Sequence, residues 1–201
     1  VTAHFCGGKL QQTLHKMPSE TDWELIVVNK WNTIPDGYQT ELTTLSNGKQ
    51  VDSRIYPALQ DLFDAMRADG IYPIVREGYR TTTDQQSILD DKIKAYEQEG
   101  LSSLLAKKMA SEWVAAPGTS EHQLGIAVDI NADKTKSTND EVYTWLAEHA
   151  WEYGFILRYP KDKENVTGTG YEPWHYRYVG KEAAKEIWQE SCCLEEYVTQ
   201  N

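Results

Sequence analysis

Residues 120–130 read Ser-Glu-His-Gln-Leu-Gly-Ile-Ala-Val-Asp-Ile, and the pattern of this stretch decides the fold around it. The part from Gly125 to Ile130 is apolar and rich in β-branched residues, which predicts a buried strand rather than a helix. The strand carries one carboxylate, Asp129, and an unpaired buried charge is costly. A bound metal ion would remove that cost, and His122, seven positions upstream, would provide a second ligand.

The spacing of this pair also sets a geometric condition. His122 and Asp129 are an odd number of positions apart, so on one continuous strand they would point to opposite faces. Gly125 lies between them and can break the strand, because glycine adopts backbone conformations that other residues avoid. A histidine taken alone is more often a core or surface residue, so the pair indicates a metal site only together with further ligands.

A second segment, Glu-Pro-Trp-His-Tyr-Arg at residues 172–177, offers those ligands. Pro173 keeps Glu172 out of the helical region, so the segment is predicted to be extended or to turn. With His175 as a third ligand, the protein would leave one coordination position for water, as catalytic zinc sites do. Glu172 would then be placed to accept the proton of that water. The structural alternative is a surface Glu–His pair beside a packed tryptophan.

Composition limits the class of protein and its partners. The chain has 201 residues, of which 40% are hydrophobic, so one domain with a sizeable core is expected. The formal net charge of −11 argues against a nucleic-acid partner, because such proteins usually carry basic patches. No apolar run approaches the roughly 20 residues of a membrane span. We expect a monomer.

The N-terminus and the cysteines bear on the location of the protein. The chain begins at Val1 rather than at methionine, so we predict a trimmed extracytoplasmic protein, anchored to the membrane through a missing N-terminal segment; a cytoplasmic location is the alternative. Three cysteines, Cys6, Cys192 and Cys193, cannot all pair within one chain. We expect unpaired structural cysteines, and a bridge from Cys6 to one of the other two is the alternative.

Periodicity and turn residues predict an α+β protein, with a small central antiparallel sheet, helices packed around it and a single zinc site. Residues 1–22 are expected to form a leader or linker, and residues 23–201 the catalytic domain. Strands are predicted at 25–28, 41–46, 49–52, 71–75, 125–130, 155–159 and 174–179. Helices are predicted at 56–69, 83–97, 101–114, 138–153, 181–189 and 194–199. Capping boxes are predicted at Thr83–Gln86 and at Thr138–Glu141.

Taken together, these motifs resemble those of a known family. The joint pattern Ser120-x-His122-x6-Asp129 and Glu172-x-x-His175, with Tyr79-Arg80 upstream, resembles the VanY/VanXY-type D-alanyl-D-alanine carboxypeptidases, which are zinc peptidases of bacterial cell-wall metabolism. The similarity extends from about residue 25 to residue 179. It includes the segments Ile-Leu-Arg-Tyr-Pro at 156–160 and Tyr-Glu-Pro-Trp-His-Tyr-Arg-Tyr-Val-Gly at 171–180.

The resemblance implies roles for seven residues. It implies that zinc is held by His122, Asp129 and His175. It also implies that Glu172 is the catalytic base, that Arg80 stabilises the developing oxyanion or grips the substrate, and that the substrate pocket is lined by Ser120 and Gln85. A guanidinium suits both tasks proposed for Arg80, since it neutralises charge and binds a carboxylate through two parallel hydrogen bonds. Other arginines are candidates for the same tasks: Arg54, Arg76 and Arg158.

The resemblance therefore implies a zinc-dependent D,D-carboxypeptidase that removes the C-terminal D-alanine from peptidoglycan stem peptides or their precursors. It also implies that the extracytoplasmic location is the bacterial cell surface. The alternatives on the same metal set are an L,D-carboxypeptidase that trims stem tetrapeptides and a D-Ala-D-Ala dipeptidase. Two other classes are weaker. A non-haem iron oxygenase usually has a His-x-Asp spacing that is absent here. A silent wall-binding module with structural zinc would not need Glu172.

Overall fold

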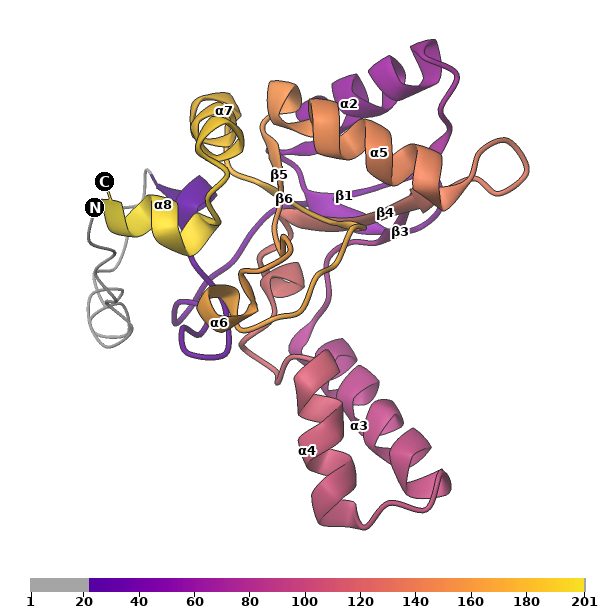
Figure 1. Cartoon of the computed structure of the whole chain (residues 1–201), viewed down its shortest axis with the longest axis vertical. Coiled ribbons are helices and arrows are strands. Elements are labelled where there is room, and N and C mark those ends of the chain that lie inside the picture. Colours follow the sequence, from indigo (N-terminus) through magenta and orange to yellow (C-terminus); the bar gives the residue numbers. More distant parts are fainter. Residues whose placement is uncertain (1–21, 201) are drawn as a thin grey trace.

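The computed structural model describes residues 22–200 and shows the α+β class predicted from the sequence (Figure 1). Its strands are β1 (Leu42–Thr44), β2 (Gln50–Asp52), β3 (Pro73–Glu77), β4 (Ala127–Ala132), β5 (Phe155–Leu157) and β6 (His175–Tyr178). Its α-helices are α2 (Tyr56–Ala68), α3 (Thr82–Gln98), α4 (Ser103–Trp113), α5 (Asn139–His149), α6 (Glu164–Thr167), α7 (Lys181–Glu190) and α8 (Leu194–Gln200). Short 3-10 helices are η1 (Trp23–Leu25), η2 (Glu121–Leu124) and η3 (Ala150–Tyr153).

The four-stranded antiparallel sheet has the order β3-β4-β6-β5, and β1 and β2 form a separate antiparallel hairpin. Strand β4 contains the apolar run of the opening stretch and lies in the middle of the sheet, as its composition predicts. In this register Asp129 of β4 lies opposite His175 of β6 on one side and opposite Glu77 of β3 on the other. The sheet therefore places three polar side chains in one row across its centre.

Helices α2 and α5 cover one face of this sheet (Figure 1). In α2 the buried residues Leu59, Leu62, Phe63 and Met66 recur at helical spacing, so the helix turns one apolar stripe toward the sheet. The main core between these layers is formed by buried aliphatic side chains, among them Met66, Val128, Ile130, Val142 and Leu146. Packing of this core fixes the position of β4, and with it the position of Asp129.

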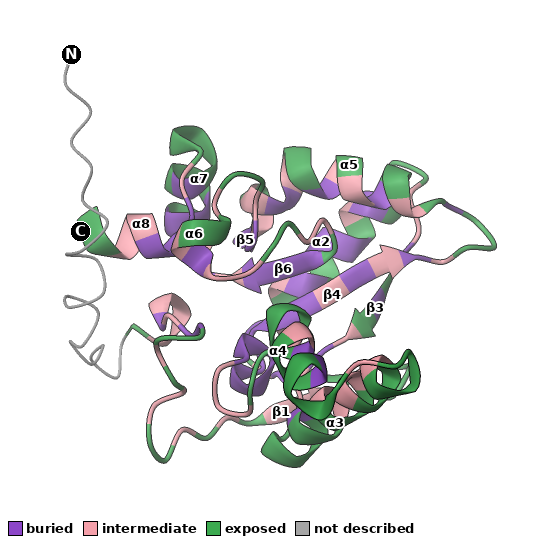
Figure 2. Cartoon of the chain, turned by 60° about the horizontal axis from the view of Figure 1, so that its bottom comes forward, coloured by how far each residue is buried: buried purple, intermediate pink, exposed green. Residues whose placement is uncertain are grey.

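Helices α3 and α4 form a hairpin that extends away from the body of the domain, and most of its surface is exposed (Figures 1 and 2). At the opposite side, α7 packs on β5 and η3, and α8 follows it. A second, smaller core there contains Ile156, Val179, Ala184, Ile187 and Leu194. The C-terminal helices are therefore part of the same folded unit as the sheet.

The predicted strand at residues 25–28 is wrong. The chain forms the 3-10 helix η1 there and then an irregular segment, although Ile26 and Val28 are buried as the apolar pattern requires. The backbone carbonyls of Glu24 and Ile26 accept hydrogen bonds from Arg177 Nη2, both at 2.8 Å. A buried guanidinium thus satisfies these carbonyls, and no strand partner is needed.

Most other predicted elements are confirmed, with small shifts. The hairpin turn at Asn47 and Gly48, helix α2, the capping box of Thr138 and Glu141, and the C-terminal helices all form. The other predicted capping box is wrong, because Thr81 and Asp84, not Thr83 and Gln86, cap α3. The strand predicted at 71–75 lies at Pro73–Glu77.

Several sequence-based expectations concern the termini and the cysteines. Those for Cys6 and for nearly all of the leader or linker at residues 1–22 lie outside the described residues. Among the described residues, Cys192 and Cys193 are not bonded to each other. In this part of the chain no helix is both long enough and apolar enough to cross a membrane.

Gly125 breaks the chain between His122 and β4, as expected, with φ +79°. A Cβ at this position would lie 3.2 Å from the backbone nitrogen of Asp52. We expect Gly125→Ala to lower the free energy of unfolding by more than about 1–2 kcal/mol, since the left-handed conformation alone costs that much and the close contact adds to it. Gly100→Ala is the matched control, because Gly100 has φ +96° but no atom near its Cβ direction. Urea unfolding should show the larger loss for Gly125→Ala; equal losses would contradict the tight packing at Gly125.

Candidate metal and catalytic site

Three side chains from three different elements meet at the centre of the sheet. His122 comes from η2, Asp129 from β4 and His175 from β6. Their potential ligand atoms all lie within 4.8 Å of one another. Both histidines are buried and the Asp129 side chain is 14% exposed. The sequence-predicted ligand set is therefore brought together by the break at Gly125 and by the β4–β6 pairing.

The hydrogen bonds orient both imidazoles toward Asp129. His122 Nδ1 donates to the carbonyl oxygen of Gly78 at 2.9 Å, and its Nε2 lies 3.3 Å from Asp129 Oδ1. His175 Nε2 donates to Glu121 Oε1 at 2.9 Å, and its Nδ1 lies 3.0 Å from the same Asp129 oxygen. Each ring thus has one nitrogen held by the protein and the other directed at a shared carboxylate.

This donor set fits a divalent cation such as zinc. Two imidazole nitrogens and one carboxylate oxygen are common zinc ligands, and a three-ligand set leaves a position for water or substrate. Outer hydrogen bonds to the second nitrogen of each ligating histidine are also typical of such sites. Gly78 and Glu121 provide them here. The residues therefore have the types, the separation and the outer partners that a catalytic zinc site requires.

The electrostatics of the three groups are strongly coupled. Burial would raise the pKa of Asp129, but the neighbouring His122 and His175 hold it well below its usual range. Burial lowers the pKa of His122, more than Asp129 raises it. Burial would also lower the pKa of His175, but hydrogen bonds to Asp129 and Glu121 outweigh it and raise this pKa to about 10. A cation that binds at Nδ1 must therefore displace a proton, so metal binding is expected to release protons.

Glu172 lies beside this cluster, in the turn that leads into β6. Its Oε2 is 3.7 Å from His175 Nδ1, and its side chain is 23% exposed. Burial raises the pKa of Glu172, although His175 opposes part of this effect. A carboxylate that is close to the ligands, partly open to solvent and raised in pKa has the properties of a general base.

Arg80 follows β3 and reaches the same site. Its Nη2 lies 4.0 Å from Asp129 Oδ2, and its Nη1 donates to Gln85 Oε1 at 3.2 Å. Arg80 Nε lies 3.6 Å from Glu77 Oε2 and is a buried donor without a hydrogen-bond partner among the residues described. Gln85 is itself held by a bond from its Nε2 to the carbonyl oxygen of Ala115 at 2.7 Å. Gln85 therefore positions Arg80 in this structure.

The other candidate arginines have different surroundings. Arg54 pairs with Asp52 and lies 3.8 Å from the ring centre of Trp23, and Arg76 is an exposed residue of β3. Arg158 is fully buried in a separate ion pair with Glu121. Ser120 is buried directly before η2, two positions before His122.

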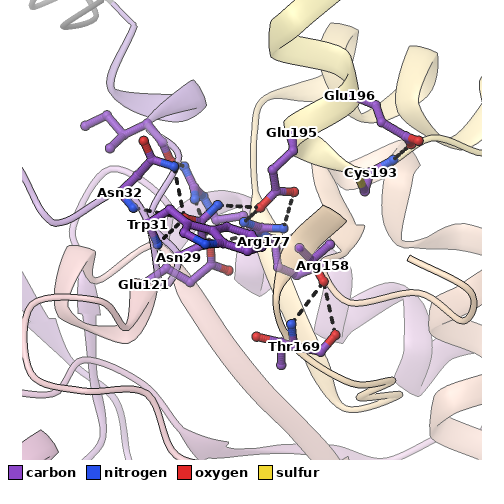
Figure 3. Close-up of polar contacts among 12 residues, drawn as sticks. Asn29, Trp31, Asn32, Glu121, Arg158, Thr169, Arg177, Cys193, Glu195 and Glu196 are labelled. Carbon is purple, nitrogen blue, oxygen red and sulfur yellow. Dashed lines mark hydrogen bonds and ion pairs between the residues drawn. The ribbon is translucent and has the colours of Figure 1, made fainter. Parts of the chain in front are cut away.

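One residue at the site was not identified from the sequence. Glu121, adjacent to His122, has a fully buried side chain and contacts His175. It also contacts Arg158 and Arg177 (Figure 3). Burial would raise the pKa of Glu121, but the two arginines hold it far below its usual range. Its place inside the motif was the only available signal, because an acidic residue before a histidine is otherwise typical of an exposed turn.

Comparisons with known proteins agree with this geometry. A family model described as VanY, D-alanyl-D-alanine carboxypeptidase, matches residues 48–181. The chain is 58% identical over 186 residues to a D-alanyl-D-alanine carboxypeptidase of Enterococcus faecalis, covering 92% of this chain and 69% of that protein.

Two solved structures are similar over most of the chain. One is a zinc complex of a mutant of the D,D-pentapeptidase VanY from a VanB-type vancomycin-resistance cassette, with a TM-score of 0.85, 60% identity, and coverage of 88% of this chain and 99% of that one. The other is VanYB with D-alanine-D-alanine, with a TM-score of 0.85, 59% identity, and coverage of 88% and 98%. From the sequence match, the shared fold and the gathered ligand set, we conclude that the chain belongs to the VanY family of D-alanyl-D-alanine carboxypeptidases.

Proposed function

We propose that this protein is a zinc-dependent D,D-carboxypeptidase that removes the C-terminal D-alanine from peptidoglycan stem peptides or their precursors. The observation that carries the proposal is the meeting of His122, Asp129 and His175 beside Glu172 and Arg80. Relatives with this activity in their names, and a similar structure with bound D-alanine-D-alanine, support the same reaction and substrate class.

His122 Nε2, His175 Nδ1 and Asp129 would hold the zinc, because these are the atoms that face one another. When bound there, zinc supplies Lewis-acid activation of water and of the scissile carbonyl. The residues of the chain then have to move one proton and neutralise one developing charge.

Glu172 is proposed to move the proton. It accepts a proton from the attacking water while the water oxygen bonds to the carbonyl carbon. It then gives the proton to the amine of the departing D-alanine as the carbon–nitrogen bond breaks. The products are free D-alanine and a peptide with a new terminal carboxylate. Its raised pKa suits both steps, because the same group must act first as a base and then as an acid.

Arg80 is proposed to stabilise the oxyanion that forms on the scissile carbonyl. We expect Arg80→Ala to lower kcat by about a hundredfold or more, the usual cost of removing one oxyanion donor, while zinc stays bound. Arg80→Lys should recover only part of the activity, since lysine lacks the planar fork. Steady-state kinetics and metal analysis measure both effects.

The control for this pair of variants is Arg76→Ala, which removes an exposed arginine from β3, the strand that precedes Arg80, and should leave kcat and KM unchanged. A raised KM with unchanged kcat in Arg80→Ala would assign Arg80 to binding of the terminal carboxylate instead. Unchanged kcat and KM would remove Arg80 from the site.

Product analysis distinguishes the proposed reaction from its two alternatives on the same ligands. Muramyl pentapeptide, muramyl tetrapeptide and free D-Ala-D-Ala are incubated with the zinc-loaded protein, and released alanine is detected by mass. A D,D-carboxypeptidase releases one D-alanine from the pentapeptide and does not act on the tetrapeptide. Release mainly from the tetrapeptide would show an L,D-carboxypeptidase, and release mainly from the dipeptide would show a dipeptidase.

We also propose that the enzyme acts outside the cytoplasmic membrane, where the wall that carries its substrates is assembled. Protease added to intact cells and to cells with disrupted envelopes tests this location. Degradation in intact cells is expected, and protection until disruption of the cytoplasmic membrane would place the enzyme in the cytoplasm.

A further inference from the structure

Glu121 is the centre of a buried ionic cluster that contacts the proposed metal site through His175. Its Oε1 accepts from His175 Nε2 at 2.9 Å. Its Oε2 accepts from Arg158 Nε and from Arg177 Nη1, both at 2.9 Å (Figure 3). The side chains of Glu121, Arg158 and Arg177 are 0% exposed. The two oxygens of this carboxylate therefore have different partners: Oε1 binds His175, and Oε2 binds the two arginines.

The cluster continues to the C-terminal helix. Arg158 donates a bidentate pair to Glu195 of α8, with distances of 2.7 and 2.9 Å, and Asn29 Nδ2 donates to Glu195 Oε1 at 3.0 Å (Figure 3). Two carboxylates and two guanidinium groups give this cluster no formal net charge. Glu195 lies beyond residues 48–181, which the family model matches, yet it is 1% exposed and closes the cluster.

Stability alone is a weak explanation for such a cluster. Buried ion pairs often contribute little net free energy of folding, because removing both charges from water costs about as much as the pairing returns. Their geometry, however, is tightly defined, and an ionised carboxylate can only accept hydrogen bonds. A side chain that contacts Glu121 must therefore present a proton to it.

This requirement has a direct consequence for His175. With a proton at Nε2 for Glu121, a neutral imidazole ring has its free lone pair on Nδ1, the atom that faces Asp129. Arg158 and Arg177 hold Glu121 Oε2 from two directions, so the carboxylate cannot turn away from the ring.

We infer that Glu121 is a positioning residue that fixes the tautomer and orientation of His175 for metal binding, and that Glu195 of α8 anchors it through Arg158. This inference rests on the proposed zinc site. It assigns helix α8 a part in supporting the catalytic centre, because Arg158 and Glu121 link Glu195 to the proposed metal ligand His175.

The test compares Glu121→Gln with the wild type. Glutamine keeps the shape but has an amide group that can donate to His175 Nε2, which would leave the proton on Nδ1, the metal-binding atom. Competition with a chromophoric chelator should show zinc affinity lowered by about 10–100-fold, the usual effect of changing an outer partner of a metal ligand. Long-range proton–nitrogen spectra of the protein loaded with cadmium-113 should show the metal coupled to His175 Nδ1 and a proton on Nε2 in the wild type. The population with this pattern should fall in Glu121→Gln.

Two further variants test the anchor and the specificity of the effect. Glu195→Gln weakens the hold on Arg158 without touching His175, so zinc affinity and the population coupled at Nδ1 should both fall, but by less than in Glu121→Gln; no change in either would remove Glu195 from the inference. Glu196→Gln on the same helix changes the contacts of Glu196 with Lys163 and with the backbone nitrogen of Cys193, neither of which belongs to the cluster, and it should change neither property.

The outcomes are distinct. Wild-type zinc affinity in Glu121→Gln, or metal coupling to His175 Nε2 in the wild type, would overturn the inference while the proposed function stands. The second readout needs no variant, so it decides the matter even where Glu121→Gln does not fold. A wild-type protein that binds no zinc at His175 would overturn the proposed function itself.

Discussion

Glu172→Gln should fold and hold zinc as the wild type does, while kcat falls by at least about a hundredfold, the low end of general-base contributions. The side chain keeps its size, so the turn before β6 is expected to be unchanged. The amide cannot accept the proton of the attacking water. Because Glu172 Oε2 lies 3.7 Å from His175 Nδ1, the carboxylate is close to the proposed metal position without replacing one of the three ligands.

The pH profile provides an independent reading of the same residue. Burial raises the pKa of Glu172. A base works only when deprotonated, so wild-type activity should fall on the acid side, as Glu172 becomes protonated. The remaining activity of Glu172→Gln should lack this acid limb.

Pentapeptide hydrolysis, metal analysis and a binding assay with a D-Ala-D-Ala-terminated peptide together measure these properties. Glu164→Gln is the matched control, because Glu164 is exposed on α6, and its kinetics should equal those of the wild type. Near-wild-type turnover in Glu172→Gln would assign water activation to another group. Loss of zinc from this variant would make Glu172 a ligand or the support of one.

The second large effect is expected from the ligands themselves. Purified wild-type protein should bind about one zinc per chain, and His122→Ala, Asp129→Ala and His175→Ala should each lose most of it. The loss of affinity should exceed the roughly 10–100-fold typical of changes to outer partners, because a direct ligand is removed. Activity should fall to background in each variant.

Metal analysis after dialysis against a weak chelator measures the occupancy. His149→Ala is the control, since this histidine of α5 pairs with Glu152 at the surface, and it should retain full zinc. Full occupancy in two of the three ligand variants would refute the ligand assignment.

The ligand set could be predicted because each member belongs to a local pattern. The apolar run around Asp129 predicts β4, and the glycine at 125 predicts the break that returns His122 to the same side. Pro173 keeps Glu172 out of the helical region, and the alternating residues after it predict β6, so the sequence places His175 on a strand. The pairing of Asp129 opposite His175 follows from the sheet topology, which the sequence did not specify.

The buried cluster could not be predicted in the same way. Glu121 occupies a position that looks exposed in the sequence, and its charge can be buried only because Arg158, Arg177 and His175 approach it from distant segments. The false strand at residues 25–28 has the same origin. Its apolar residues are buried, but the backbone carbonyl of Ile26 accepts a hydrogen bond from Arg177 rather than from a neighbouring strand.

Anomalous diffraction at the zinc edge from crystals of the zinc-loaded Glu172→Gln protein tests the central claim most directly. One peak is predicted between His122 Nε2, His175 Nδ1 and the carboxylate of Asp129, at about 2.0–2.2 Å from each ligand atom. A zinc peak at other residues, or coordination by the side chain at position 172, would contradict the proposed site.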